Sequence, residues 1–202
     1  MAEDNQDAQA PGRLAVIQDL ANSFDVRRGR DDLATPGEAE RWLGKHRIAV
    51  PAAGLTAADL AALHGLRAAL RGLLLANNGG DSRAQDLDVL NGVVGESGLR
   101  PTFGPGCVVD IDIPAAGFVA SLAAIVAIML QASSAGTWSR LKACPQDACN
   151  YTFYDRTKNK SRTWCSMSRC GSQAKMRTYR ARQRTRARSG TRPEHNSPAP
   201  RA

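Results

Sequence analysis

Four of the five cysteines fall close together near the C-terminal end, as two pairs of identical spacing. Cys144 and Cys149 form the first pair, Cys165 and Cys170 form the second, and fifteen residues separate the pairs. Two C-x4-C pairs joined by a short loop can bring four thiolates to the corners of a tetrahedron, the coordination that a structural Zn²⁺ ion favours. The spacing therefore predicts one structural zinc ion held by all four. A thiol redox switch is the alternative, because thiols at this spacing could also oxidise.

The distribution of cysteines also indicates the compartment. Secreted disulfide frameworks spread their cysteines along the chain, whereas a few clustered cysteines suit a reducing cytosol and a metal site. Residues 1–12 are acidic and polar and lack the apolar core of a signal peptide. We therefore expect a cytoplasmic protein in which residues 1–12 are a disordered leader.

Charge divides the chain into two parts of opposite sign. Residues 140–192 contain 15 Lys or Arg and two acidic residues, a net charge of +13, whereas residues 1–138 carry 11 basic and 16 acidic residues, a net charge of −5. Such a positive block is what a polyanion binder needs, because each neutralised phosphate releases condensed counterions. We expect DNA as the partner, and an adaptor that binds RNA or an acidic protein is the alternative.

Residues 13–138 are expected to form a mainly helical domain. Thr35 before Pro36, and Thr56 with Asp59, are helix-capping patterns, and the second predicts a long helix that ends near Ala76. Apolar periodicity predicts two further helices, over about 13–24 and 84–94.

The segment 114–135 is the most apolar in the chain. Its strongly apolar part of about 16 residues is shorter than the ~20 that a membrane span requires, so a buried helix is expected and no membrane contact.

The preceding residues, 99–113, alternate in polarity and predict one small, half-buried β-hairpin. Cys107 stands alone in it and is expected to act as a small hydrophobe, not as a metal ligand.

Two groups of polar residues in this domain have alternative interpretations. Asp19 and Asn22 either bind a small ligand or cap and turn the end of the first helix. His64, Arg67 and Arg71 share one face of the long helix, which indicates a solvated surface, with an anion-binding ridge as the alternative.

Residues 139–188 predict a zinc-ribbon-like module followed by a basic helix. Tyr151, Phe153 and Trp164 are expected to form a small core instead of a base-stacking platform. From Ala174 onward good helix formers continue, with arginine at every second position after Arg180, so helical geometry distributes these charges around the cylinder. We expect this end of the helix to fray until phosphates neutralise it, and residues 189–202 to be a disordered tail.

The basic residues of the module are the candidate DNA contacts. They are expected to meet the phosphate backbone, which positions a protein without specifying sequence, while Gln173 could reach a base edge. The phosphate candidates are Arg156, Lys158, Lys160, Arg162, Arg169, Lys175, Arg177, Arg180 and Arg182. An enzyme is not expected, because four cysteines leave zinc no open position for water and no nucleophile stands with a base at motif spacing.

Motifs in both parts of the chain resemble a known pair of domains. The C-terminal motifs are Cys144-x4-Cys149, Phe153-Tyr154-Asp155-Arg156, Asn159-x-Ser161-Arg162-x-Trp164-Cys165-Ser-Met-x-x-Cys170-Gly171, Ala174-Lys175 and Tyr179-Arg180-x-Arg182. They resemble the CGNR zinc-finger family. The earlier motifs, Asp19-Leu-Ala-Asn22-Ser23, Asp32-Leu-x-Thr35-Pro36 and Leu55-Thr-x-x-Asp59-Leu, are similar to the ABATE domain that accompanies this finger in bacterial proteins assigned to stress-induced transcription regulation.

The resemblance implies a zinc-dependent, DNA-binding transcription regulator whose N-terminal domain senses a signal or a small-molecule effector. One departure stands out, because Cys170-Gly171-Ser172-Gln173 occurs where the family has Cys-Gly-Asn-Arg. Any contact that the family's arginine makes must therefore come from Arg169 or Lys175 here, or be absent.

Overall fold

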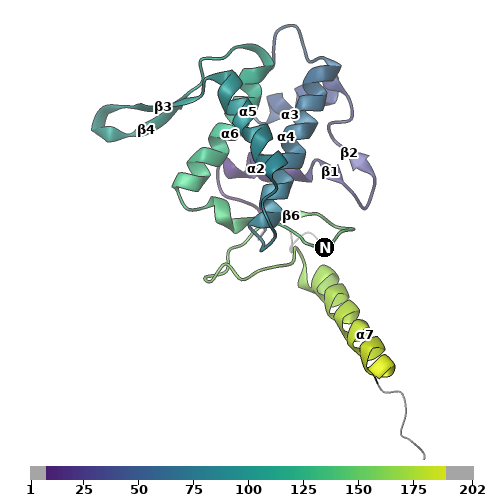
Figure 1. The fold of residues 1–202 in the computed structure, drawn as a ribbon. Helices are drawn as coiled ribbons and strands as arrows, with labels where there is room; N and C mark the ends of the chain where they lie inside the picture. Colours follow the sequence, from purple (N-terminus) through teal and green to yellow (C-terminus); the bar gives the residue numbers. More distant parts are fainter. Residues whose placement is uncertain (1–7, 190–202) are drawn as a thin grey trace, which may run out of the picture. The chain divides into compact units, whose positions relative to one another are not determined.

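The computed structural model describes residues 8–189, which are mainly helical with small antiparallel sheets (Figure 1). The fold class predicted from the sequence is confirmed. The described residues fall into two compact units that divide between Cys165 and Ser166. The helices of the first unit are α2 (Leu14–Asn22), α3 (Pro36–Lys45), α4 (Ala57–Ala76), α5 (Ala84–Ser97) and α6 (Gly117–Ser134). Its strands pair as β1 (Phe24–Asp25) with β2 (Arg30–Asp31), β3 (Arg100–Phe103) with β4 (Val109–Asp112), and β5 (Leu141–Ala143) with β6 (Thr152–Tyr154).

The core of the first unit lies where α2, α4 and α6 pack on one another. Leu66 and Leu70 of α4 are fully buried, as is Ile125 of α6. Leu141, Ala143 and Tyr154 of the β5–β6 hairpin belong to the same apolar cluster as these helices. The hairpin that precedes and follows the first cysteine pair is therefore part of the main core.

Helix α6 is the one helix among the described residues that is long and apolar enough to cross a membrane, by length and composition alone. Half of its apolar window is buried inside the protein, and nine of its residues are buried in all. This burial fits the core helix that the sequence predicts.

The two helix starts predicted from capping patterns are confirmed. The Glu38 amide donates to the Thr35 hydroxyl, and Pro36 occupies the first turn of α3. In α4 the Asp59 amide donates to the Thr56 hydroxyl at 3.1 Å, while the Thr56 amide donates to the Asp59 carboxylate at 2.8 Å. This reciprocal capping box satisfies donors that the first helical turn cannot pair internally.

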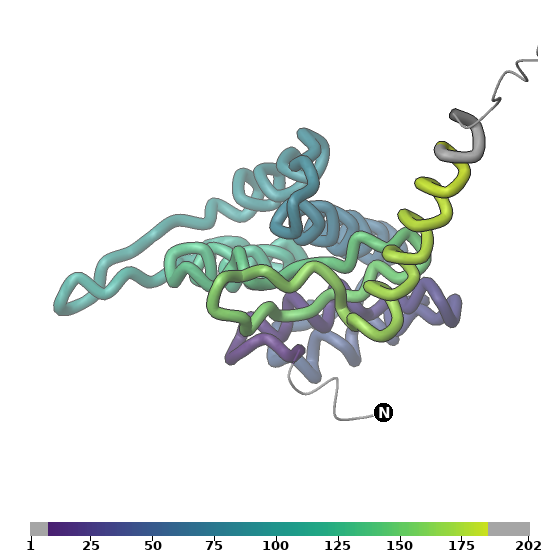
Figure 2. Tube along the Cα trace, turned by 90° about the horizontal axis from the view of Figure 1, so that it is seen from below, coloured from purple at the N-terminus to yellow at the C-terminus, as the bar shows by residue number. Residues whose placement is uncertain are grey.

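The β3–β4 hairpin forms where the sequence predicts it, but it is not half-buried. Phe103 and Val109 are 75% and 59% exposed, and Figure 2 shows the hairpin extending away from the helices. Cys107 is exposed at its tip with a φ of 58°, so the expectation that it acts as a small hydrophobe within a half-buried hairpin is wrong. Alternation shows that the two faces of a hairpin differ, but no part of residues 8–189 covers the apolar face here.

The polar side chains on one face of α4 (His64, Arg67 and Arg71) form hydrogen bonds with other parts of the chain. His64 Nε2 lies 2.8 Å from the Leu33 carbonyl oxygen. Arg67 donates to both carboxylate oxygens of Asp31, at 2.6 and 2.8 Å. Neither a solvated face nor an anion-binding ridge describes this row, because its side chains hold neighbouring loops.

Residues 8–12, part of the predicted disordered leader, are ordered against the core. Ala8 and Ala10 are buried, and the Ala8 carbonyl accepts a hydrogen bond from the Tyr154 amide at 2.8 Å. Residues 1–7 of that leader, and 190–202 of the predicted tail, lie outside the described residues.

The described part of the second unit, residues 166–189, consists of one helical segment. A π-helical turn, η3 (Met167–Gly171), leads directly into α7 (Ser172–Ser189). The predicted basic helix is therefore present. It continues as helix to Ser189, so the fraying expected beyond Arg180 is not seen in the described residues.

Candidate metal centre

The first cysteine pair is held at the end of the β5–β6 hairpin. Leu141 pairs with Tyr154 and Ala143 with Thr152, so Cys144 leaves the hairpin directly after its last pair. The Cys144 amide donates to the Tyr151 carbonyl at 2.9 Å, which extends the ladder by one step. The Cys149 amide then donates to the Gln146 carbonyl at 2.8 Å and closes the turn between the two cysteines.

The second cysteine pair lies at the start of a helix. The Ser166 hydroxyl accepts from the Arg169 amide and caps η3, and the Ser166 carbonyl accepts from the amides of Cys170 and Gly171 at 2.9 and 3.1 Å. These bonds fix the backbone on both sides of the Cys170 thiol. Backbone donors near thiolates also spread the negative charge of a thiolate cluster.

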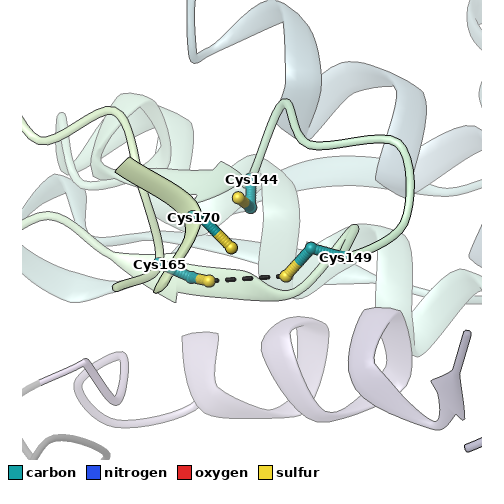
Figure 3. A group of neighbouring side chains, drawn as sticks. All are labelled: Cys144, Cys149, Cys165 and Cys170. Carbon is teal, nitrogen blue, oxygen red and sulfur yellow. Dashed lines mark hydrogen bonds between the residues drawn. The ribbon is translucent and has the colours of Figure 1, made fainter. Parts of the chain in front are cut away.

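The four thiols predicted as ligands are brought together (Figure 3). Their sulfur atoms all lie within 4.8 Å of one another, and the sulfurs of Cys149 and Cys165 are 3.4 Å apart. Four thiolates around zinc at about 2.3 Å stand about 3.8 Å apart in a tetrahedron, so this spacing fits one ion. Cys107, by contrast, is exposed on the β3–β4 hairpin and is not part of the group.

The electrostatics of the thiols also favour a cation. Hydrogen bonds with Cys144 and Cys149, together with burial, raise the pKa of the Cys165 thiol far above its ordinary value. A Zn²⁺ ion supplies the positive charge that lets such thiols ionise, and its binding releases their protons. Four cysteines positioned for one ion match a single structural zinc.

The C-terminal end of α4 holds the chain on both sides of Cys144. The Asn77 side-chain amide donates to the carbonyls of Trp138 and Leu141, each at 2.9 Å. The neighbouring Asn78 amide donates to the carbonyls of Ala143 at 2.8 Å and Thr163 at 2.7 Å. Asn78 thus joins the residue before Cys144 to the segment that leads into Cys165. We call Asn77 and Asn78 the asparagine pair.

Two other side chains of the helical domain bond to the backbone of β6 and of the residues just before it. Arg71 of α4 donates to the Asn150 carbonyl, at 3.2 Å from Nε and 2.6 Å from one terminal nitrogen. Asn22 of α2 donates to the Thr152 carbonyl at 3.0 Å and accepts from the Thr152 amide at 2.8 Å. Asn22, a candidate ligand-binding residue in the sequence, therefore uses its amide to hold β6.

Asp19, the other candidate ligand-binding residue, has different surroundings. Its carboxylate lies 3.8 Å from His46 Nε2, and the His46 ring packs on Trp42 with ring centroids 4.2 Å apart. Burial raises the pKa of Asp19 and lowers the pKa of His46. The structure places Asp19 and Asn22 in separate environments.

A buried ion pair organises the basic loop between the two cysteine pairs. Lys142 Nζ lies 2.8 Å from the Asp155 carboxylate and also donates to the carbonyls of Lys160 and Arg162. Asp155 is 0% exposed and accepts hydrogen bonds from the amides of Thr157 and Arg162. Burial alone would raise the pKa of Asp155, but the bonds from Lys142 and Thr157 outweigh it and lower the pKa.

Lys142 and the asparagine pair were not predicted from the sequence as parts of the site. A pattern for the ion pair does exist, because Lys142 stands between two buried positions of β5 and Asp155 directly follows β6. A lysine that alternates into a buried position requires a buried acid nearby. The asparagine pair has no comparable pattern, since Asn-Asn-Gly-Gly after a helix looks like an ordinary turn.

The candidate DNA-binding residues fall into two groups. Arg162 is partly buried, with its guanidinium over the Phe153 ring at 4.9 Å and bonded to the carbonyls of Trp164 and Cys165. Arg156 is exposed but packs on Tyr154 and donates to the Gln9 carbonyl. The remaining candidates are all exposed: Lys158, Lys160, Arg169, Gln173, Lys175, Arg177, Arg180 and Arg182.

A mainly helical domain with four clustered cysteines at its C-terminal end, followed by a basic helix, defines a zinc-finger protein. Two family models match the chain in this order. Residues 14–139 match the ABATE model, described as "Putative stress-induced transcription regulator", and residues 140–183 match the model of the CGNR zinc finger. The chain therefore belongs to the ABATE family and carries a CGNR zinc finger, as the resemblance in the sequence indicates. The comparison with curated proteins found no match.

Proposed function

We propose that this chain is a cytoplasmic, zinc-dependent transcription regulator that binds duplex DNA. The observation that carries the proposal is the one-sided charge of the segment around the cysteines. The sequence has no acidic residue between Asp155 and Glu194, and Asp155 itself is buried against Lys142. Asp147, between the first two cysteines, is an exposed acid, whereas the exposed charges of residues 156–185 are all positive, which favours a polyanion partner.

The zinc ion is proposed to act structurally. Its four cysteine ligands would fill the tetrahedral coordination sphere and leave no position for an activated water, so the proposal includes no catalysis. Held by all four cysteines, the ion would link Cys165 and Cys170 to Cys144 and Cys149 between β5 and β6. Loss of the ion should therefore disorganise the segment that carries the basic side chains.

The proposed phosphate contacts are the exposed basic residues. Arg162 is left out because its guanidinium already bonds to two carbonyls next to Cys165 and packs on Phe153. Its role in the proposal is to support the ligand loop.

The helical domain is proposed to sense a small effector, with Asp19 as its polar group. Asp19 lies beside His46, whose buried Nε2 has no hydrogen-bond partner among the described residues. A ligand with both a donor and an acceptor would satisfy this pair. Thermal-shift screening of a metabolite library should give a hit that Asp19→Ala abolishes, and hits that survive this change would contradict the assignment.

The test of DNA binding is a salt titration with the full-length, zinc-loaded protein. Fluorescence anisotropy of labelled duplex DNA should show log K falling by roughly 0.9 per phosphate contact for each tenfold rise in salt. Structured RNA and single strands at the same salt are the comparison arms. Affinity that is independent of salt, or stronger for RNA, would overturn the proposal, and genome-wide mapping of wild type against Cys144→Ser would identify the target sites.

A further inference from the structure

Within residues 174–185 of α7, the basic side chains are arranged in two rows, with a less charged stripe between them. The stripe consists of Met176, Tyr179 and Gln183, which lie within about 60° of one another at 100° per residue. Met176 and Tyr179 are 51% and 59% exposed, and Gln183 is exposed as well. Large apolar side chains exposed in the middle of a helix face indicate a contact surface.

The two rows flank this stripe. Arg177, Arg180 and Arg184 lie about 70–130° to one side of it, and Lys175 and Arg182 lie about 70–90° to the other. All five side chains are exposed, and α7 contains no acidic residue. Over residues 174–185 of the helix, the basic side chains are therefore not distributed evenly around the cylinder.

The opposite face of α7 has a different chemistry. It is formed by Ala174, Thr178, Ala181 and Thr185, which carry no charge. The Thr178 and Thr185 hydroxyls each donate to the carbonyl four residues earlier, at 3.1 Å. Only the face with the stripe and its two rows combines charge with large exposed side chains.

We infer that α7 enters the major groove of duplex DNA with Met176, Tyr179 and Gln183 toward the base edges. The major groove admits one α-helix and has a phosphate strand on each side, which matches a central stripe between two basic rows. The deep, narrow major groove of duplex RNA does not admit side chains in this way. This inference rests on the proposed function and adds the residues that determine sequence preference.

Gln183 is the residue through which the bases would be distinguished. Its side-chain amide donates to the Tyr179 hydroxyl at 3.0 Å, which holds the carboxamide in place across one turn of the helix. This bond takes up one N–H group, while the second N–H and the oxygen are the pair that glutamine offers to adenine. Met176 lies at one edge of the same stripe and has the apolar surface that suits a thymine methyl group. The expected target therefore contains an A·T-rich step.

The experiment is selection from a randomised duplex DNA library with the full-length, zinc-loaded protein. The selected duplex and a scrambled duplex of equal composition are then compared by anisotropy. We expect Gln183→Ala to reduce the ratio of the two affinities by about 5- to 150-fold. Tyr179→Phe should cause a smaller loss, since it removes only the hydroxyl that positions Gln183. Thr178→Ala, on the opposite face, is the matched control and should leave the ratio unchanged.

A second variant separates preference from affinity. Arg177→Gln should weaken binding to both duplexes equally and lower the salt slope by about 0.9. If the wild type binds DNA but Gln183→Ala keeps the wild-type preference at unchanged helix content, the inference fails while the proposed function stands. If the wild type prefers duplex RNA or binds no nucleic acid, both fail.

Discussion

Asn22 and Thr152 are 130 residues apart, and the side-chain amide of Asn22 bonds to both the amide and the carbonyl of Thr152. An asparagine that bonds in both directions to one residue replaces a neighbouring strand at that point. The Ala8 carbonyl accepts a hydrogen bond from the Tyr154 amide, the second pairing of β6 with residues outside its hairpin. The strand β6 is therefore completed by the helical domain, and the loops that carry Cys144 and Cys149 are built on that domain.

The asparagine pair provides a direct test of this arrangement. Asn78→Ala removes donors from the buried Ala143 carbonyl and the exposed Thr163 carbonyl, and the unpaired buried group costs about 1–3 kcal/mol. We expect a lower free energy of unfolding and weaker zinc binding, measured by urea titration and by competition with a chromophoric chelator. Asn91→Ala, an exposed position on α5, is the control and should leave zinc binding unchanged, while its higher helix propensity raises the free energy of unfolding by up to about 0.7 kcal/mol. Equal zinc affinity in Asn78→Ala and the control would show that the contact is incidental.

Removal of the metal should destabilise the helical domain as well as the finger. Leu141, Ala143 and Tyr154 share one apolar cluster with α2, α4 and α6, so disorder in the cysteine loops opens that cluster. A strong chelator should lower the melting temperature of one cooperative transition followed by far-UV circular dichroism. Cys107→Ser should behave as wild type, whereas Cys144→Ser should resemble the chelated protein. Two separate transitions, with the helical one unchanged by chelation, would contradict the expectation.

The Lys142–Asp155 pair should be strongly coupled. Lys142→Met leaves the Asp155 carboxylate buried without its partner, which costs about 3–5 kcal/mol in comparable cases. The double variant Lys142→Met with Asp155→Leu should recover part of this loss, because no unpaired charge remains. Chemical denaturation of the four proteins in the cycle measures the coupling. An additive result would mean that the two charges act independently.

The Asp31–Arg67 pair predicts a defined dependence on pH. Burial alone would raise the pKa of Asp31, but the bonds from Arg67 and the Leu33 amide outweigh it and hold the pKa below the ordinary value of 3.8. A lowered carboxyl pKa contributes stability that is present above pH 3.8 and is lost as the pH falls through the lowered pKa. Wild type should therefore exceed Asp31→Asn in stability at neutral pH, and the difference should shrink in acid. A difference that is constant with pH would refute the ionic contribution.

Two glycines of α4 give a matched pair of substitutions with opposite expected signs. A Cβ on Gly72 would lie 2.0 Å from the Asp86 carboxylate, which is buried and bonded to Arg83, whereas a Cβ on Gly65 meets nothing within 4 Å. Gly65→Ala should stabilise the protein by up to about 1 kcal/mol through helix propensity. Gly72→Ala should destabilise it by about 1–3 kcal/mol through overpacking. Thermal denaturation measures both, and a stabilising Gly72→Ala would show that α5 can move away.

Features that depend on neighbouring residues could be predicted from the sequence. Thr35 and Thr56 cap their helices through groups three residues away, so the necessary residues stand within one turn. The four cysteines could be predicted because zinc restricts both the donor type and its spacing. In each case the chemistry limits the possible partners to nearby positions.

Features that depend on distant partners could not be predicted. Arg67 and Arg71 have the spacing of a solvated face, yet they bond to Asp31 and to Asn150, 36 and 79 residues away. The alternation of Val109 with Asp110 correctly predicts the strand β4. Burial of the apolar face of this strand depends on whether another element covers that face. Periodicity carries no information about the partner of a face.

The asparagine pair also limits how this finger can be used outside its own chain. Asn77 and Asn78 provide four hydrogen bonds to backbone carbonyls at and beyond position 138, and they belong to the end of α4. A graft that starts at Arg140, where the finger model begins, would leave Ala143 and Thr163 without these donors. A transplantable version has to carry the end of α4 or receive substitute donors, so exchange of fingers between relatives should succeed where both asparagines recur.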